Sequence, residues 1–306
     1  MCETCYARKR GPLLYENMSD DAPHRATAFD DEHYQKHTSI ESMTPWVGFE
    51  DWSIITHRHD AQHVLYQLGV CSSLTASAFR HMLLGGRFGA GTLEENIEAL
   101  YIDFRNSPEA KRDSHLPAKF TKRKLGLDGA SPMISGTYKH AQVRTMFHYC
   151  ARTFSSFVGD SHSQDLLVAK TCLQALSRFI LLLDGWPCML TDEQRIRALT
   201  LGKTFRNACS ILLALSKAQA NGIWKCTPKF HQLDHIIQSL HVERFNPFAQ
   251  WANWGEETLM GLTARIRRST HAGHCGLRSS LERYVLWLHA EHVVVDESFC
   301  ETKKKL

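Results

Sequence analysis

The chain has 306 residues, which is enough for one large domain or for one domain that carries a large insertion. Hydrophobic residues make up 43% of it and charged residues 22%, as in an ordinary globular protein, which excludes a low-complexity chain. With 36 basic and 32 acidic side chains the formal net charge is +4, so the charge permits nucleic-acid binding without requiring it.

The N-terminal half of the chain predicts one strand and several helices between irregular segments. The predicted elements, in chain order, are an irregular polar lead-in over 1–50, a strand over 52–58, a helix over 61–84, a helix over 93–106, and a loop with one short helix over 107–136. Thr92 and Glu95 have the spacing of a capping box, which predicts where the second of these helices begins.

The C-terminal half predicts long helices. They are expected over about 139–158, 164–184, 192–219, 228–241, 255–268 and 276–293, with an irregular or strand-like segment around 243–254. Thr191 is the predicted cap of the third of these helices, and Asn221-Gly222 is the signal that ends it.

The cysteines and the apolar runs predict an intracellular protein. Of the ten cysteines only Cys2 and Cys5 are closely spaced, which favours reduced thiols over a disulfide framework. The N-terminus lacks the apolar segment of a signal peptide, and Lys170 and Arg178 interrupt the longest apolar run. We therefore expect no membrane partner.

Asp60 lies where the predicted strand meets the predicted helix, with His63 three residues further on. An aspartate at such a junction usually caps the helix by accepting hydrogen bonds from free backbone N–H groups, and this is the preferred interpretation. The alternative is a metal ligand at a strand end, with His63 one helical turn away.

Two short patterns are candidate parts of a zinc site. His231 and His235 are four residues apart on a predicted helix, but Gln232 occupies the position where a zinc protease needs glutamate, so a histidine pair packed in the core is the preferred interpretation. Cys2 and Cys5 have zinc-knuckle spacing but supply only half of a site. Cys2, Cys5, His231 and His235 are thus candidate zinc ligands, and His271, His274 and Cys275 are further candidates near the C-terminus.

A charged stripe follows one face of the helix predicted over 255–268. Glu257, Arg265 and Arg268 recur along it at steps that keep them on the same side. The plain interpretation is a solvated charged face, and the functional one is a catalytic carboxylate beside arginines that hold phosphates.

Four stretches, in their order along the chain, resemble transposases of the CACTA group and related transposon-derived families. They are the paired Cys2 and Cys5, the Asp-x-x-His motif of Asp60 and His63 followed by Leu68-Gly69-Val70, the stretch with Lys229, His231 and His235, and Glu257 in a Glu-x-x-Met-Gly context after Asn246-Pro247 and Trp254. The resemblance covers most of residues 1–295, without a matching motif over 90–220, where an insertion is expected.

This resemblance implies an RNase H-like fold in which two aspartates and a glutamate bind two Mg²⁺ or Mn²⁺ ions and cleave and join DNA strands. By position Asp60 matches the second aspartate and Glu257 the glutamate, and His63 is a further candidate metal ligand. No strand-borne aspartate precedes Asp60 in the required place. We therefore expect a chain that is truncated at its N-terminus, with catalysis lost or incomplete.

The predicted fold class is mainly α with a small β component, a partial RNase H-like core interrupted by a large helical insertion. The predicted parts are the lead-in 1–50, a strand–helix core piece 51–88, the helical insertion 89–225, a second core piece 226–298 and a charged tail 299–306.

The leading functional hypothesis is a transposase-derived protein with DNA as its partner, located in the nucleus and a candidate homo-oligomer. Its alternatives are a non-catalytic nucleic-acid-binding protein and a helical interaction protein. The basic residues expected to contact nucleic acid are Lys122, Arg123, Lys124, Arg265, Arg267 and Arg268.

Overall fold

The computed structural model describes residues 2, 4–37, 53–54, 58–113, 116–219 and 223–250 of the chain. Residues Met1–Ala252 form one compact unit, and Asn253–Leu306 form a second, which lies outside the described residues. The predicted mainly helical class is confirmed. Within the described ranges, β structure is confined to isolated bridges that pair Cys5 with Ala28, Arg8 with Leu14, and Met189 with Phe245.

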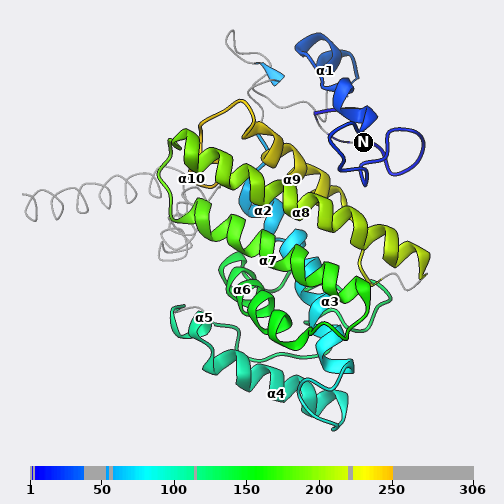
Figure 1. The fold of residues 1–306 in the computed structure, drawn as a ribbon, viewed down its shortest axis with the longest axis vertical. Helices are drawn as coiled ribbons and strands as arrows, with labels where there is room; N and C mark the ends of the chain where they lie inside the picture. Colours follow the sequence, from blue (N-terminus) through cyan, green and yellow to red (C-terminus); the bar gives the residue numbers. More distant parts are fainter. Residues whose placement is uncertain are drawn as a thin grey trace, which may run out of the picture. The chain divides into compact units, whose positions relative to one another are not determined.

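Most helices lie close to where the sequence predicts them (Figure 1), but Asp31–His37 and Pro247–Gln250 are helical in segments that were predicted to be irregular. They are α1 (Asp31–His37), α2 (Ala61–Leu65), α3 (Val70–Leu84), α4 (Leu93–Asn106), α5 (Pro108–Lys111), α6 (His140–Phe157), α7 (Gln164–Asp184), α8 (Asp192–Ala218), α9 (Pro228–Ser239) and α10 (Pro247–Gln250), with a 3-10 turn over Pro23–Thr27. The predicted helices over 255–268 and 276–293 fall outside the described residues.

The predicted cap residues fix where two helices begin. Thr92 accepts a hydrogen bond from the backbone N–H of Glu95, whose side chain in turn accepts one from the backbone N–H of Thr92. Thr191 and Gln194 form the same capping box at the start of α8. Each box satisfies backbone groups that the first helical turn leaves unpaired, so these starts could be predicted from local sequence alone.

The single helix predicted over 61–84 is wrong in one respect, because the structure has two helices there. The chain breaks between α2 and α3 at Leu68, whose φ is +49°, and at Gly69. A Cβ atom on Gly69 would lie only 2.3 Å from the carbonyl oxygen of Val64, so the tight reversal needs glycine. The apolar pattern continues through the break because both helices face the core.

The strand predicted over 52–58 lies partly outside the described residues. Ser53 and Ile54 are described and do not form a strand; both donate hydrogen bonds to the carboxylate of Asp31 at the start of α1. The RNase H-like core, which requires a sheet, therefore stays a prediction.

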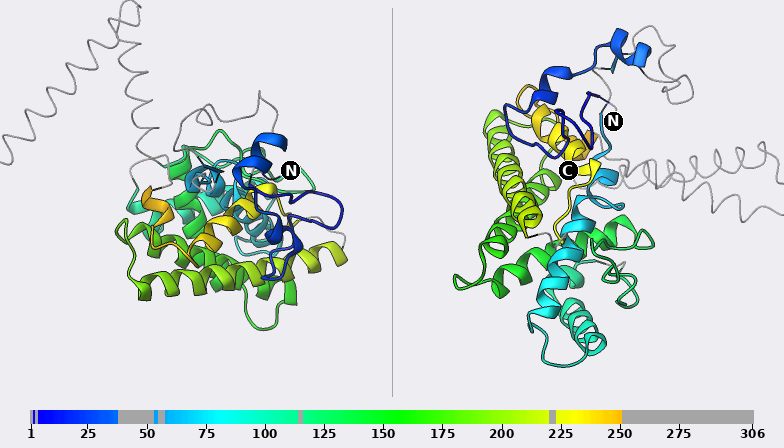
Figure 2. Two further views of the ribbon diagram at one scale, coloured as in Figure 1. Left: turned by 90° about the horizontal axis from the view of Figure 1, so that it is seen from above. Right: turned by 90° about the vertical axis from the view of Figure 1, so that its right-hand side faces the viewer.

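Two layers of helices enclose the core of the first unit. α7 and α8 pack along each other, α6 lies against α7 and α3, and α9 lies against α2 and α8 (Figures 1 and 2). Twelve of the fifteen residues of α3 are buried, among them Phe79 and Met82, so this helix is at the centre of the unit. Its buried Ser72 donates a hydrogen bond to the backbone carbonyl of Tyr66, which offsets the cost of burying a hydroxyl.

α7 has the length and hydropathy of a helix that could cross a membrane. Half of its most apolar stretch is buried inside the protein. Its inward residues, such as Leu173, Leu176 and Ile180, pack with α6 and α8, as those of a core helix do.

A candidate zinc site

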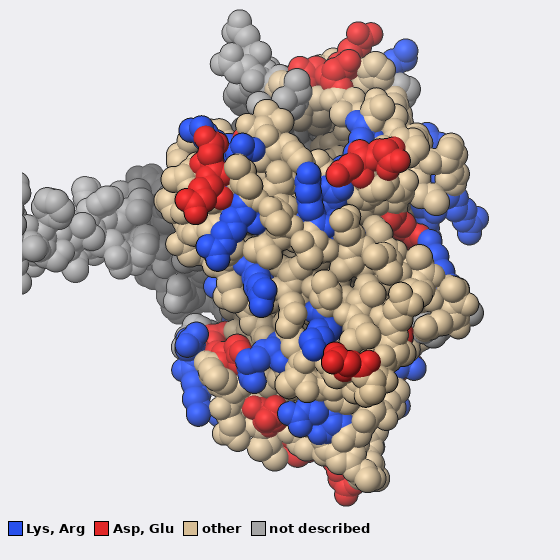
Figure 3. Space-filling view, in the orientation of Figure 1, with Lys and Arg blue, Asp and Glu red and all other residues tan. Residues whose placement is uncertain are grey.

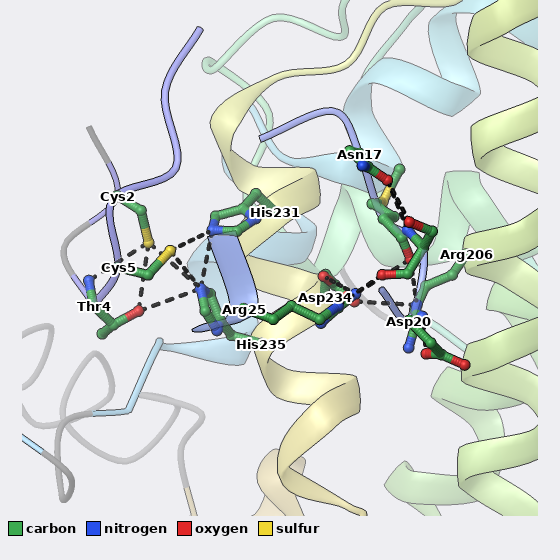
Figure 4. A network of polar contacts seen from close by, with 12 residues as sticks. Cys2, Thr4, Cys5, Asn17, Asp20, Arg25, Arg206, His231, Asp234 and His235 are labelled. Carbon is green, nitrogen blue, oxygen red and sulfur yellow. Dashed lines mark hydrogen bonds and ion pairs between the residues drawn. The ribbon is translucent and has the colours of Figure 1, made fainter. Parts of the chain in front are cut away.

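The four candidate zinc ligands converge on one point, although more than two hundred residues separate the two pairs (Figure 4). Cys2 and Cys5 come from the N-terminal segment, and His231 and His235 come from α9. The Sγ atom of Cys5 lies 3.2 Å from Nε2 of His231 and 3.6 Å from Nε2 of His235. The Sγ atom of Cys2 lies 3.5 Å from Nε2 of His235, and the two Nε2 atoms are 2.9 Å apart.

These distances fit the edges of a tetrahedron around Zn²⁺. With Zn–S bonds of about 2.3 Å and Zn–N bonds of about 2.0 Å, ideal edges are roughly 3.3 Å between two nitrogens and roughly 3.5 Å between nitrogen and sulfur. The closest pair, the two histidine nitrogens, needs to separate by only a few tenths of an ångström. Two thiolates and two imidazoles are also the donor set of a structural zinc site, closed to further ligands.

Local sequence shapes both halves of the site. On α9 the spacing of four puts His231 and His235 on one face, and Pro228 provides a favourable first residue for the helix. In the N-terminal segment the backbone N–H of Cys2 donates to the carbonyl of Ala7, and the backbone N–H of Thr4 donates to Sγ of Cys2 at 3.5 Å. This turn presents both sulfur atoms to α9, and an N–H···S hydrogen bond stabilises a thiolate.

The thiols of Cys2 and Cys5 titrate as a pair. A hydrogen bond from Cys5 holds the pKa of the Cys2 thiol well below its usual range, helped by His231 and His235 and opposed by burial. The hydrogen bond with Cys2, together with burial, raises the pKa of Cys5 in turn. One thiolate is therefore favoured before any cation binds, and the second proton would leave when a metal does bind.

Buried polar atoms surround His231 on the side away from the sulfurs. The ring of His24 packs edge-on against that of His231 at 4.7 Å, and His24, His231 and Asp234 each bring a side-chain N or O atom within 4.8 Å of the others. Nδ1 of His231 and both ring nitrogens of His24 are buried and have no hydrogen-bond partner among the residues that the structure describes. A carboxylate beside the outer nitrogen of a ligating histidine is the usual means of orienting such a ring.

A second attachment holds the N-terminal segment beside the site. Asp234, on α9, receives a hydrogen bond of 2.8 Å from Nη2 of Arg25. Arg206 of α8 is 1% exposed, and its Nε lies 3.1 Å from Oδ1 of Asp234 while donating its hydrogen to the carbonyl of Met18. Arg206 also pairs with Asp20. One buried carboxylate thus contacts two guanidinium groups that reach it from different segments.

The site differs from the sequence-based interpretation in its partners. The preferred interpretation of His231 and His235 was a packed pair, and they are indeed buried or half-buried, but Cys2 and Cys5 lie against them. His271, His274 and Cys275 fall outside the described residues. Sequence reasoning missed Asp234 and Arg206. The only local signal was the position of Asp234 three residues after His231 on the same helix.

Asp60 is the cap of α2, as the preferred interpretation held. Its Oδ1 accepts hydrogen bonds from the backbone N–H groups of Gln62 at 2.8 Å and His63 at 3.3 Å, and its Oδ2 lies 2.7 Å from Nδ1 of His63. Lys229 of α9 donates to the backbone carbonyl of His63, which joins the two motifs of the resemblance. Glu257 lies outside the described residues, so a metal shared by Asp60 and Glu257 stays a prediction.

The predicted nucleic-acid contacts are only partly described. Lys122 pairs with Asp128 at 3.3 Å, the ammonium of Lys124 lies over the ring of Tyr138, and the side chain of Arg123 is exposed. The other three predicted contacts, Arg265, Arg267 and Arg268, lie outside the described residues.

Comparison with known proteins finds no matching family model, no significantly similar curated protein and no significantly similar solved structure.

Proposed function

We propose that Cys2, Cys5, His231 and His235 bind one structural Zn²⁺, and that the chain is a zinc-stabilised helical protein of transposase descent that binds nucleic acid without cleaving it. The observation that supports the zinc is the convergence of four sulfur and nitrogen atoms at tetrahedral spacing. The observation that supports the descent is that the cysteine pair and the histidine pair, two separate stretches of the resemblance, meet in one place.

The role proposed for the zinc is to attach the N-terminal segment to α9. Because the four ligands fill a tetrahedron, no position is left for substrate or water, which is the arrangement of a structural rather than a catalytic site. Cys5 and His231 are 226 residues apart, and a Zn²⁺ ion that binds only the folded chain adds its binding free energy to the free energy of unfolding.

Metal analysis of the purified full chain tests the zinc. We expect about one zinc per chain, and Cys5→Ser should lose most of it, whereas Cys188→Ser, which removes an exposed cysteine, should keep it. Replacing zinc with Co²⁺ in the wild type should produce the visible bands of tetrahedral cobalt and a thiolate-to-cobalt charge-transfer band. Octahedral cobalt bands without thiolate character would refute the site even if the serine variant fails to fold.

The absence of cleavage is proposed because the carboxylate of Asp60 is already used locally. Both of its oxygens contact backbone or side-chain groups of its own helix, as a cap requires. Incubation of the zinc-loaded chain with DNA and Mg²⁺ or Mn²⁺ should leave the DNA intact. Metal-dependent strand cleavage that Asp60→Asn abolishes would overturn this part of the proposal and support the active transposase, the second candidate.

A further inference from the structure

A hollow of about 610 Å³ lies between α5, α6 and α7, away from every residue of the zinc site. Its volume is within the range of about 300–1,000 Å³ that ligand sites occupy. α6 contributes Arg144, His148 and Arg152, which recur every four residues and so lie on one face of the helix. α7 contributes Ser177 and Arg178 from the opposite side.

The lining is rich in arginine. Four arginines, Arg112, Arg144, Arg152 and Arg178, line the hollow together with Glu109 and Asp113. Figure 3 shows Lys and Arg side chains, with a few carboxylates among them, over the part of this face that α5, α6 and α7 form.

Two of the four arginines form ion pairs with carboxylates, and the other two do not within the described residues. Arg152 donates from Nε and Nη2 to the two oxygens of Glu109 at 2.8 Å and 3.1 Å, and Arg144 pairs with Asp184 at 2.9 Å. These pairs hold the α6 guanidiniums in place. The side chains of Arg112 and Arg178 are exposed and make no ion pair or hydrogen bond within the part of the chain that the structure describes.

His148 and Ser177 form a hydrogen bond in the lining of the hollow. Nδ1 of His148 lies 2.9 Å from Oγ of Ser177, and Nε2 of His148 is buried with no hydrogen-bond partner in the described ranges. Burial lowers the pKa of His148 to about 4, so the ring is neutral at pH 7. If Ser177 donates to Nδ1, the ring proton lies on Nε2. The hollow thus combines two guanidiniums held by ion pairs with two that are unpaired within the described residues.

From this arrangement we infer that the hollow binds a phosphate ester, with Arg112 and Arg178 as its primary contacts. We call this hollow the arginine groove. Guanidinium groups bind phosphate oxygens in a bidentate geometry, and a phosphate offers enough oxygens for several arginines at once. A carboxylate ligand, with only two oxygens, would engage fewer of these guanidinium groups than a phosphate does. The arginine groove shares no residue with the zinc site, so the phosphate proposal and the zinc proposal can each fail without the other.

Fluorescence anisotropy of a labelled single-stranded oligonucleotide, with ATP and inorganic phosphate as competitors, tests the groove in the full chain. The double variant Arg112→Gln/Arg178→Gln should weaken oligonucleotide binding at least tenfold and reduce the salt slope by about one. Arg197→Gln, which removes an exposed arginine of α8 outside the groove, should change binding by less than twofold. Zinc content, measured in parallel, should be the same in all variants.

The outcomes separate the sources of the phosphate. Binding of the oligonucleotide, displaced weakly by ATP, identifies the backbone of a nucleic acid as the ligand. Direct binding of ATP or phosphate that the double variant loses, without oligonucleotide binding, supports the groove but removes nucleic-acid binding from the proposed function. If none of the three probes binds at low salt, or if the double variant binds as the wild type does, the inference is overturned.

Discussion

Replacing Asp234 by asparagine should strongly destabilise the protein while removing only one charge. Asp234 is almost completely buried and contacts both Arg25 and Arg206. Removing one partner of a buried ion pair typically costs about 3–5 kcal/mol, because the other charge stays buried without compensation. Arg206 keeps Asp20 and the carbonyl of Met18 as partners, which places the expected loss near the lower end, at about 3 kcal/mol.

Urea denaturation at pH 7 with excess zinc measures this loss, and Asp192→Asn is the matched control. Asp192 pairs with Arg244, but the two side chains are 53% and 57% exposed, so its loss should cost no more than about 1 kcal/mol. Equal losses in the two variants, to within about 0.5 kcal/mol, would refute the argument that burial makes the Asp234 network the stronger one.

Three further changes have expected outcomes. Thr92→Ala should lower the free energy of unfolding by about 1 kcal/mol in denaturant titrations, since it removes the capping box of α4; no loss would mean that the cap is redundant. Gly202→Ala should lower the free energy of unfolding by about 1–3 kcal/mol, because the new Cβ would lie 2.6 Å from Cγ2 of Ile237. Gly159→Ala, with open space around it, should be near neutral. Equal free energies of unfolding for the two variants would refute the contact at Gly202. Because the pKa of His148 falls from 6.5 to about 4 on folding, the unfolded chain binds the extra proton between these values, so stability should fall as the pH drops from 6.5 to 4, by up to about 3 kcal/mol. His148→Gln should flatten that part of the pH–stability curve, and an unchanged curve would contradict the assignment.

Local signals predicted the helices well because their causes are local. The hydroxyl of Thr92 and the carboxylate of Glu95 need only each other and three residues of backbone, so the sequence is sufficient. The break at Gly69 was missed although its cause is also local: the carbonyl of Val64, five residues earlier, occupies the place of a side chain. Apolar periodicity does not record such an approach.

The candidate zinc site was only half predictable for a related reason. The spacing within each pair, Cys2 with Cys5 and His231 with His235, shows that each can contribute to one metal. Which pairs meet depends on how the N-terminal segment lies on α9, and no periodicity encodes a contact across 226 residues. The same holds for Asp234 and Arg206, whose pairing depends on the packing of α8 against α9.

The distance along the chain between the two cysteines and the two histidines bears on how the protein is made. During synthesis His231 is translated 226 residues after Cys5. At about 5–20 residues per second this interval lasts roughly ten to fifty seconds. Once they have left the ribosome, the two thiols are exposed to oxidants and to competing thiophilic ions for the rest of that time, so the yield of correctly metallated protein should depend on the redox state and zinc supply during translation.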